Sequence, residues 1–470
     1  MSATATTEKK YLKWYQKLAY GSGDLASNCS YGLVSSFVLL YLTGTLGLDS
    51  AIIGSLMLAS KVLDGISDVI FGTLIDRTHS KLGKARPWML FGQVGVSLCL
   101  FLLFAIPAGS TTMQYIYFFI VYTALNAVFY TANGIAYSSL VALITKNNNE
   151  RVQLGSFRFM FAVVTNIFMG FAVTGMVEKF GSGAAGWRTT ALIFAIVGLV
   201  VNTISCLAVK ELPEEELGDN TSEAAEEGKA VAEEKKHGFA ETAKILVHNK
   251  YYLMILAIYI VYYIMSNLTT GAGVFCATYY WGDGSLLGQF SMMKMFPVII
   301  ALAIAPVLIK KTGSMQKVNF WGYAISSVLG IPMIYFAMQK NLSMFLLFMF
   351  IKGIFAGTLS GSLNALIAEA SGYTTRTTGI HMDGMMYSCS SLGVKVGGGI
   401  GTAAVGWLLK LGGFVGTATV QSESAIRMIF NLYITFPFVI GIIITVLLAF
   451  LDVEKANKKW DAEHQKEAQA

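Results

Sequence analysis

The sequence predicts an all-α membrane protein in which twelve transmembrane helices form two six-helix bundles. Hydrophobic residues make up 54% of the 470 residues and charged residues only 13%, about half the charged share of a typical soluble domain. The mean hydropathy of +0.58 means that a 50.9 kDa globular protein could not hide this much apolar surface in its interior. One long polar stretch divides the apolar segments into two sets of six. These observations exclude a soluble enzyme, a nucleic-acid-binding protein and a disordered chain.

A transmembrane helix needs about 20 mainly apolar residues to cross the hydrocarbon layer. Twelve segments have this length, namely 18–42, 51–75, 88–107, 114–142, 157–179, 188–209, 251–280, 287–309, 318–339, 343–369, 381–410 and 425–451. The predicted domains are an N-terminal bundle at 1–209, a cytoplasmic linker at 210–250, a C-terminal bundle at 251–451 and a cytoplasmic tail at 452–470. The Glu/Ala/Lys-rich stretch 214–236 predicts a flexible or partly helical tether, with a regulatory role as the alternative.

The positively charged residues predict the orientation of the chain. An even number of spans puts both termini on one side of the membrane. Most of the 34 Lys and Arg residues lie in segments on that side, including the N-terminal segment, the linker and the tail. Because Lys and Arg accumulate in cytoplasmic loops, we expect both termini in the cytoplasm. We expect a monomeric, multi-pass protein of the plasma membrane.

The two halves repeat a short basic loop. Residues 72–84 follow span two and residues 308–317 follow span eight, and both segments combine glycine with several Lys or Arg residues. Similar loops at equivalent places indicate a duplicated six-helix unit. Parallel repeats of this kind are the architecture of the major facilitator fold.

Span two carries three ionisable residues, Lys61, Asp64 and Asp68. Inside a span such residues cost several kcal/mol unless they are paired or face water, so they are candidate functional residues. The spacings i, i+3 and i+7 put them on one face of the helix. Two carboxylates one turn apart can bind a small hard cation such as Na⁺, or they can share a proton. The alternative is a structural charge pair in which Lys61 neutralises one aspartate.

Stripes of polar residues on spans one and four predict two walls of a water-filled cavity. The residues recur at helical spacing and are Tyr20, Asp24, Ser27, Asn28, Tyr31 and Ser35 on span one, and Asn126, Tyr130, Asn133 and Tyr137 on span four. Amide and hydroxyl groups bind sugar hydroxyls, and aromatic rings cover the C–H faces of a sugar. The alternative is hydrogen bonding between helices, which is common for Asn and Ser in membranes.

The second half adds a polar stripe on span eleven, formed by Asp383, Tyr387, Ser391 and Lys395. The run 397–399 consists of three glycines, which permit close packing or bending of this helix. Lys294 and Lys352 are also intramembrane, and the sequence assigns a partner to neither.

The run KVLDGISDVIFGTLIDRTHSKLGKARPW at 61–88 resembles the signature of the glycoside–pentoside–hexuronide:cation symporters. That signature has a basic residue, two aspartates one turn apart, and a glycine-lysine-x-basic-proline-tryptophan loop. Residues 20–28, 150–158 and 387–395 are similar to the family as well, so the resemblance covers nearly all twelve spans. It implies a secondary active transporter, without enzymatic activity, that takes up a sugar or glycoside by alternating access. Coupling to Na⁺ or H⁺ would drive it, with no other cofactor.

The resemblance also implies site residues. Cation binding falls on Asp64, Asp68 and Thr131, with Asn133 beside the position of a family acid in span four. The resemblance and the polar stripes together predict the substrate-binding residues, which are Asp24, Asn28, Tyr130, Asn133, Tyr137, Arg158, Tyr387, Ser391 and Lys395. The cytoplasmic loop with Asp76, Arg77, Lys84 and Arg86 is expected to latch one half to the other by charge pairing.

The sequence departs from the family's melibiose carriers at three positions. The acids of spans one and four and the stacking Trp of span four fall on Asn28, Gly134 and Ser138. A melibiose-type galactoside site is therefore not implied, and the pattern is closer to the xyloside and glucuronide branches. The missing carboxylate leaves both Na⁺ and H⁺ open as the coupling ion. A carrier of amphipathic lipids on the same fold and a transport-dead sensor are the alternative functions.

Overall fold

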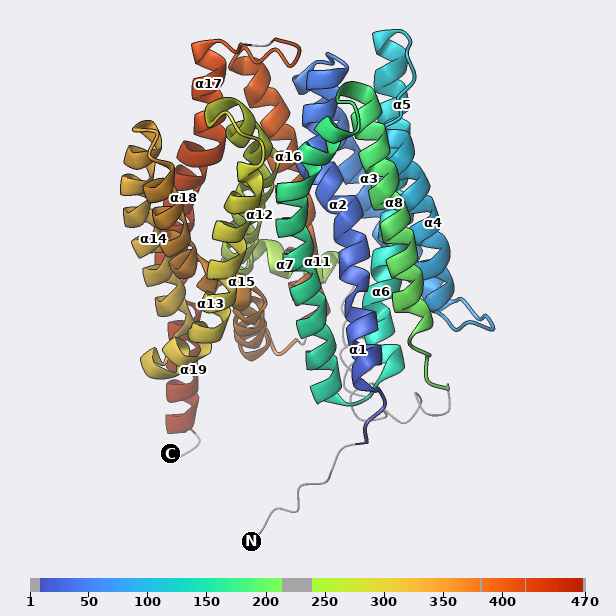
Figure 1. Ribbon diagram of the computed structural model, residues 1–470. Helices are drawn as coiled ribbons and strands as arrows, with labels where there is room; N and C mark the ends of the chain where they lie inside the picture. The colour runs from blue at the N-terminus through green and yellow to red at the C-terminus, as the bar shows by residue number, and fades with distance from the viewer. Residues whose placement is uncertain (1–8, 214–238, 381–382, 419, 468–470) are drawn as a thin grey trace. The chain divides into compact units, whose positions relative to one another are not determined.

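The computed structural model describes residues 9–213, 239–380, 383–418 and 420–467, which form helices and connecting turns without a strand (Figure 1). The helical segments of the first half are α1 (Trp14–Gly21), α2 (Gly23–Leu40), η1 (Tyr41–Thr45), α3 (Ser50–Asp76), α4 (Arg86–Leu103), α5 (Thr111–Thr123), η2 (Ala124–Tyr130), α6 (Thr131–Ile144), α7 (Asn148–Lys179) and α8 (Gly183–Leu207). The predicted tether at 214–236 lies outside the described residues.

The helical segments of the second half begin with α11 (Phe239–His248), which precedes the seventh span. They continue with α12 (Lys250–Phe275), η3 (Cys276–Tyr280), α13 (Leu286–Thr312), α14 (Met315–Met338), α15 (Leu342–Thr378), α16 (Asp383–Leu411), α17 (Glu423–Phe430), η4 (Asn431–Thr435), α18 (Phe436–Phe450) and α19 (Val453–Glu467). The tail after span twelve is therefore helical over α19.

The number of long helices agrees with the predicted twelve spans when α3 is included. Eleven of the described helices are long and apolar enough to cross a membrane, and α3 is not among them. It has 27 residues, so at about 1.5 Å per residue it is about 40 Å long and sufficient to span a bilayer. Along this length α3 carries four ionisable residues, Lys61, Asp64, Asp68 and Asp76.

Four of the spans contain a π-helical segment, in which one extra residue widens the turn. η1 ends the first span of the first half, and η3 ends the first span of the second half. This correspondence supports the duplicated unit inferred from the basic loops. η2 lies in the middle of span four, between α5 and α6. Such turns are frequent at functional sites because they change the direction of the following side chains.

The chain divides into two compact units. The first comprises Met1–Asp219, Gly273–Gln289 and Gly406–Ile426, and the second comprises Asn220–Ala272, Phe290–Val405 and Arg427–Ala470. The ends of spans seven and eleven thus belong to the first unit, although they follow the linker in the sequence. The boundaries at 209 and 251 remain a prediction from the sequence.

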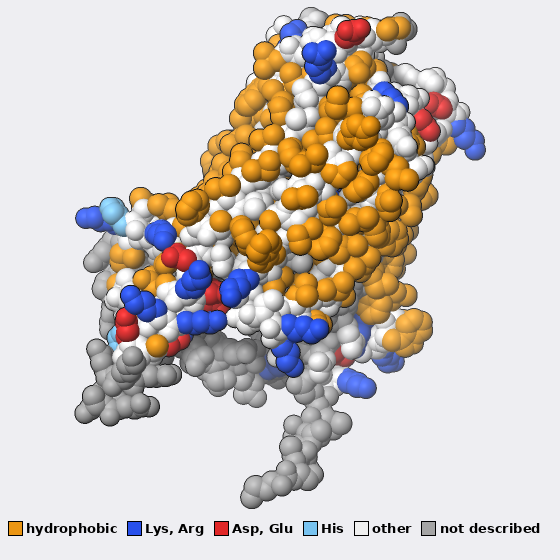
Figure 2. Space-filling view, turned by 90° about the vertical axis from the view of Figure 1, so that its left-hand side faces the viewer, with side chains coloured by type: hydrophobic (Ala, Val, Ile, Leu, Met, Phe, Trp, Pro, Cys, Tyr) orange, Lys and Arg blue, Asp and Glu red, His pale blue; other side chains and the backbone are white. Residues whose placement is uncertain are grey.

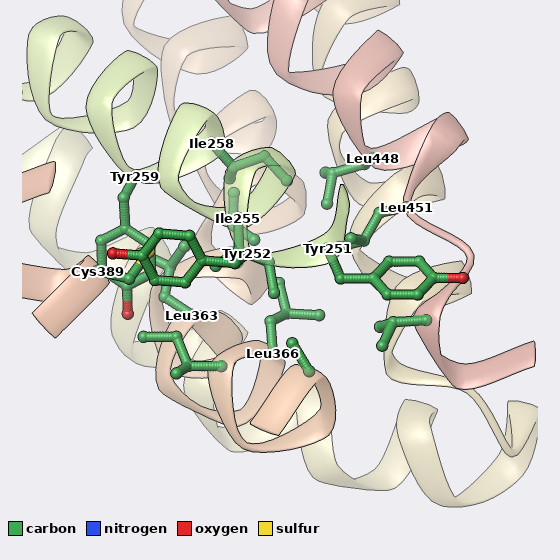
Figure 3. Close-up of a cluster of buried hydrophobic side chains, with 14 of the residues drawn as sticks. Tyr251, Tyr252, Ile255, Ile258, Tyr259, Leu363, Leu366, Cys389, Leu448 and Leu451 are labelled. Carbon is green, nitrogen blue, oxygen red and sulfur yellow. The ribbon is translucent and has the colours of Figure 1, made fainter. Parts of the chain in front are cut away.

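Each unit has its own buried apolar cluster. In the first unit, buried residues of α1, α3, α4, α6 and α8 meet around Tyr20, Met89 and Leu140. In the second unit, α12 packs its buried side chains against α15 and α18 (Figure 3). Figure 3 labels Tyr251, Ile255, Ile258 and Tyr259 of α12, Leu363 and Leu366 of α15, and Leu448 of α18.

Large apolar side chains also cover the outer surface. On α3, Val62, Ile66 and Val69 are among the exposed ones. Figure 2 shows one face of the molecule, where apolar side chains fill the broad middle and Lys and Arg gather mainly near the lower end. An exposed apolar band of this extent is the surface of a protein surrounded by lipid.

Candidate functional site

Asp64 on α3 interacts with side chains on two sides. The Thr131 hydroxyl donates to Asp64 Oδ1 over 2.7 Å, and the Lys61 ammonium lies 3.5 Å from Asp64 Oδ2. The Asp64 side chain is 14% exposed, so both contacts lie where water screens them little. Asp68 follows one turn later on α3 and is half-buried. The structure thus brings Asp64 and Thr131 together, as the resemblance implies.

Thr131 is the first residue after the π-helical segment η2. Its hydroxyl lies 2.9 Å from the Asn126 carbonyl oxygen as well as 2.7 Å from Asp64. A hydroxyl has one proton, so it donates to only one of these two acceptors at a time. The widened turn therefore offers Thr131 an alternative acceptor within its own helix.

Asp24 and Arg158 form a second charged group, between α2 and α7. Arg158 Nε donates to Asp24 Oδ2 over 2.6 Å, and these side chains are 24% and 18% exposed. The guanidinium carbon lies 4.1 Å from the centre of the Tyr137 ring, which is a cation–π contact. The Tyr137 hydroxyl in turn donates to the Tyr20 carbonyl over 2.7 Å. The arrangement fixes the orientation of Arg158 from two sides.

Asn28 extends this group along α2. Its amide nitrogen donates to the Asp24 carbonyl over 2.7 Å, and its amide oxygen accepts from Asn166 over 2.9 Å. Asn166 is not among the residues predicted from the sequence. It follows Arg158 by two helical turns on α7, and that spacing was the signal that could have identified it.

Stacked aromatic rings connect the two groups. The Tyr31 and Tyr130 rings lie 5.6 Å apart with an interplanar angle of 27°. Tyr130 directly precedes Thr131, and Tyr31 follows Asn28 by three residues on α2. The stacked rings thus lie between the helix positions of Thr131 and Asn28.

Asn133 forms its hydrogen bonds within a buried group between helices. It is 3% exposed, and its amide nitrogen donates to the Met89 carbonyl over 2.8 Å. Gln93 and Asn202 complete this buried group, which joins α4, α6 and α8. The structure therefore places Asn133 in the packing between helices and not with the cation-site or sugar-site candidates.

The span-eleven candidates lie on α16 in the second unit. Tyr387 is 40% exposed, Ser391 is exposed and Lys395 is half-buried. This exposure leaves the Tyr387 and Ser391 hydroxyls accessible on the surface of the second unit.

The loop between α3 and α4 has its partner within the first unit. The Glu211 carboxylate accepts from the backbone N–H groups of Lys84, Ala85 and Arg86 over 2.7 to 3.0 Å. Arg86 Nε donates to the Cys206 carbonyl over 3.2 Å. Asp76 and Arg77 are exposed at the end of α3. Glu211, which the sequence analysis did not select, is the acidic group that holds this loop.

The fold, the intramembrane charges and the polar cluster define a membrane transporter. Residues 19–455 match the family model of the MFS/sugar transport proteins, and the chain belongs to this family. It is a multi-pass membrane protein and not an enzyme, and the resemblance to the glycoside–pentoside–hexuronide:cation symporters is confirmed.

Curated relatives match almost end to end. The isoprimeverose transporter of Lactiplantibacillus pentosus is 26% identical over 466 residues, which are 98% of this chain and 93% of the relative. The glucuronide carrier protein homolog of Escherichia coli (strain K12) is 23% identical over 408 residues, 86% of this chain and 85% of the relative. The crystal structure of a D-xylose-proton symporter superposes with a TM-score of 0.64 at 12% identity, covering 94% of this chain and 98% of that one. The last likeness supports the major facilitator fold.

Proposed function

We propose that the protein carries a neutral glycoside or pentoside across the plasma membrane by alternating access, together with a cation. The observation that carries this proposal is a set of contacts and chain neighbours in the first unit. It runs from Asp64 and Thr131 through the stacked rings of Tyr130 and Tyr31 to Asn28. Such a set couples the occupancy of a cation site to the geometry of a sugar site. The relatives named for isoprimeverose and glucuronide are in agreement with a carbohydrate substrate.

Asp64 and Asp68 are the proposed cation site. A cation that takes over Asp64 Oδ1 frees the Thr131 hydroxyl to donate to the Asn126 carbonyl instead. The Lys61 ammonium already places one positive charge near Asp64 Oδ2. A proton on Asp64 or Asp68 adds no second ion beside that ammonium, whereas Na⁺ would be repelled by it. We therefore favour H⁺ as the coupling ion.

Asp24, Asn28, Tyr130, Tyr137 and Arg158 are the proposed sugar site of the first unit. Sugar hydroxyls would bind the carboxylate, amide and guanidinium groups, and the tyrosine rings would cover the apolar face. Arg158 is already paired with Asp24 over 2.6 Å. A hexuronide carboxylate would have to compete with Asp24 for Arg158, so this pair favours a neutral substrate.

The orientation and the boundaries of the halves belong to the same proposal. The excess of Lys and Arg in the termini, the linker and the loop after α3 supports cytoplasmic termini. With this orientation the α3–α4 loop and Glu211 lie at the cytoplasmic face. The halves 1–209 and 251–451 would then be the two moving bodies, joined by 210–250.

Purified protein in Na⁺-free proteoliposomes tests the proposal. External pH is recorded while neutral glycosides, pentosides and hexuronides are added one at a time. We expect alkalinisation with a neutral sugar and loss of the signal in Asp64→Asn and Asp68→Asn, while the exposed-carboxylate control Glu178→Gln keeps it. Uptake that needs Na⁺ would contradict proton coupling, and a response to hexuronides alone would contradict the neutral substrate. Flat traces with every sugar, with and without Na⁺, would contradict sugar symport itself.

A further inference from the structure

The second unit contains a cavity that is separate from the proposed cation and sugar sites of the first unit. Its volume is about 180 Å³, and its walls come from α12, α13, α14, α15 and the η4–α18 segment. All of its lining residues belong to the second unit. An engineered protein cavity of about 150 Å³ holds benzene, so this space is sufficient for a small organic molecule.

The lining is mainly apolar and adaptable. Four methionines, Met265, Met293, Met333 and Met349, contribute to it together with Phe345. Methionine side chains are flexible and polarizable, and they adjust to guests of different shape. The cavity can therefore bind the apolar part of a small ligand without requiring one particular shape.

Two lysines also line the cavity, Lys294 from α13 and Lys352 from α15. They lie eight and ten residues after the first residues of their helices. Because α13 and α15 are separated by one antiparallel span, they run in the same direction. At about 1.5 Å per residue, both lysines lie about 12 to 15 Å from the same ends of these helices.

Close packing of α13 and α15 brings the two lysines to the same contact. A Cβ on Gly353 would lie 2.8 Å from Pro297 Cβ, and a Cβ on Gly357 would lie 2.7 Å from Ala301 Cβ. Lys352 directly precedes Gly353, and Lys294 precedes Pro297 by one turn. Both lysines thus stand beside the contact of α13 with α15, and both line the same mainly apolar cavity.

The contacts of Lys294 leave its charge uncompensated. Its ammonium donates to the Thr269 and Thr270 hydroxyls over 3.2 and 3.3 Å, and both of these partners are neutral. The cavity lining that the structure describes includes no Asp or Glu. A charge inside a membrane-spanning bundle is costly unless an opposite charge or water accompanies it. An anion is the ligand that satisfies both lysines.

We propose that this cavity binds a small monocarboxylate, with its carboxylate held between Lys294 and Lys352 and its apolar body against the methionines. The Ser266 and Ser360 hydroxyls of the lining are further hydrogen-bond donors for the carboxylate. A single negative charge suits the site, because the apolar walls cannot solvate a multiply charged anion.

Thermal unfolding of the purified full-length protein in detergent tests this proposal, with sodium benzoate as the probe. The Na⁺ concentration is held constant at pH 7 with sodium sulfate, so that occupancy of the proposed cation site by Na⁺ does not change. We expect benzoate to raise the unfolding midpoint saturably and its neutral isostere benzamide to leave it unchanged. An equal shift with benzamide would overturn the recognition of the carboxylate. An equal shift with the same concentration of chloride would overturn the role of the apolar walls.

Two lysine variants locate the effect. Lys294→Met and Lys352→Met each remove one charge-assisted contact, so benzoate affinity should fall about tenfold or more. Lys310→Met, on the exposed last turn of α13, should keep the benzoate shift. Because each cavity variant removes an uncompensated charge, its midpoint without benzoate should not fall. Retention of the full benzoate shift in both cavity variants would place the benzoate elsewhere.

Discussion

Arg158 makes contacts that a lysine cannot reproduce. Its planar guanidinium binds Asp24 through Nε and at the same time lies 4.1 Å from the centre of the Tyr137 ring. Lysine keeps the charge, but it is a compact, strongly hydrated cation without a flat face. The side chain therefore determines both the charge and the shape of the proposed sugar site.

Arg158→Lys should weaken sugar binding about tenfold, because stacking of a desolvated guanidinium on an aromatic ring contributes about 1 to 2 kcal/mol. Arg151→Lys is the matched control on the same helix, where Arg151 Nε donates to the Thr145 carbonyl at the start of α7. Equilibrium binding of the sugar found in the transport assay measures both variants. Equal affinities of the two variants would remove Arg158 from the sugar site.

Asp49 lies outside the spans, in the turn before α3, and it makes the stability of the folded protein depend on pH. Burial raises its pKa, but the Lys410 ammonium at 2.6 Å and the N–H groups of Ile52 and Ala51 outweigh this and hold the pKa below its ordinary value near 3.8. A carboxyl group with a depressed pKa contributes stability that is complete above its unfolded pKa. That stability is lost as the pH falls through the lower folded pKa.

Asp49→Asn should therefore lower the thermal midpoint at pH 7, and its difference from the parent protein should shrink as the pH falls below about 3.8. The loss at pH 7 should be small, because the ion pair with Lys410 is exposed to water and screened by it. Unfolding midpoints of the two proteins between pH 3 and 7 measure it. A constant difference across this range would show that the ion pair with Lys410 does not matter.

At the scale of elements, the two halves share a carboxylate cap. Glu211 lies four residues after the end of α8, and it accepts backbone N–H groups at the start of α4. Glu454 lies four residues after the end of α18, and it accepts the N–H groups of Met315 and Gln316 at the start of α14. The helix dipole also stabilises a negative charge at a helix N-terminus. The repeat inferred from the basic loops thus extends to the acid that holds each loop.

Replacement of either cap should destabilise its own half. Glu211→Gln and Glu454→Gln keep the side-chain shape but remove the charge, and each should cost about 1 to 3 kcal/mol, since hydrogen bonds to charged groups contribute this much. The exposed Glu178→Gln is the control. Thermal unfolding in detergent provides the measurement. Midpoints equal to that of Glu178→Gln would show that the caps do not contribute.

The helices also show which features of the fold and the site could be predicted from the sequence. The length of the apolar segments predicted the spans. The cost of a charge inside a span identified Asp64 of α3 as a residue that requires a polar partner. Regular helical spacing puts Asn126, Tyr130 and Asn133 of the span-four stripe on one face. The π-helical segment η2 changes the spacing between Asn126 and Tyr130, and both Asn126 and Asn133 are buried. No spacing rule reveals an inserted residue, and none identifies Glu211, whose role depends on the return of the chain after α8.

At the scale of the whole molecule, glycines allow distant parts of the chain to touch at the backbone. The segments Gly273–Gln289 and Gly406–Ile426 belong to the first unit, and they meet its helices where a side chain would not fit. A Cβ on Gly170 of α7 would lie 2.7 Å from Gly288 Cα, and one on Gly406 would collide with the Ser50 carbonyl. Alternating access requires such contacts to separate and to form again in each cycle. Backbone contacts without interlocking side chains suit repeated separation.

Gly170→Ala should shift the protein towards the state in which this contact is open. Gly175→Ala on the same helix is the matched control, because a Cβ there meets no atom within 4 Å. A thiol introduced by Thr43→Cys reports the opening, since Thr43 is 2% exposed and its carbonyl lies against Gly416. The five native cysteines are buried and contribute little background.

Overpacking of this kind costs about 1 to 3 kcal/mol, so the thiol should be labelled about fivefold faster or more than in the control. Equal labelling rates in the two backgrounds would mean that the Gly170–Gly288 contact does not control access at this end of the spans.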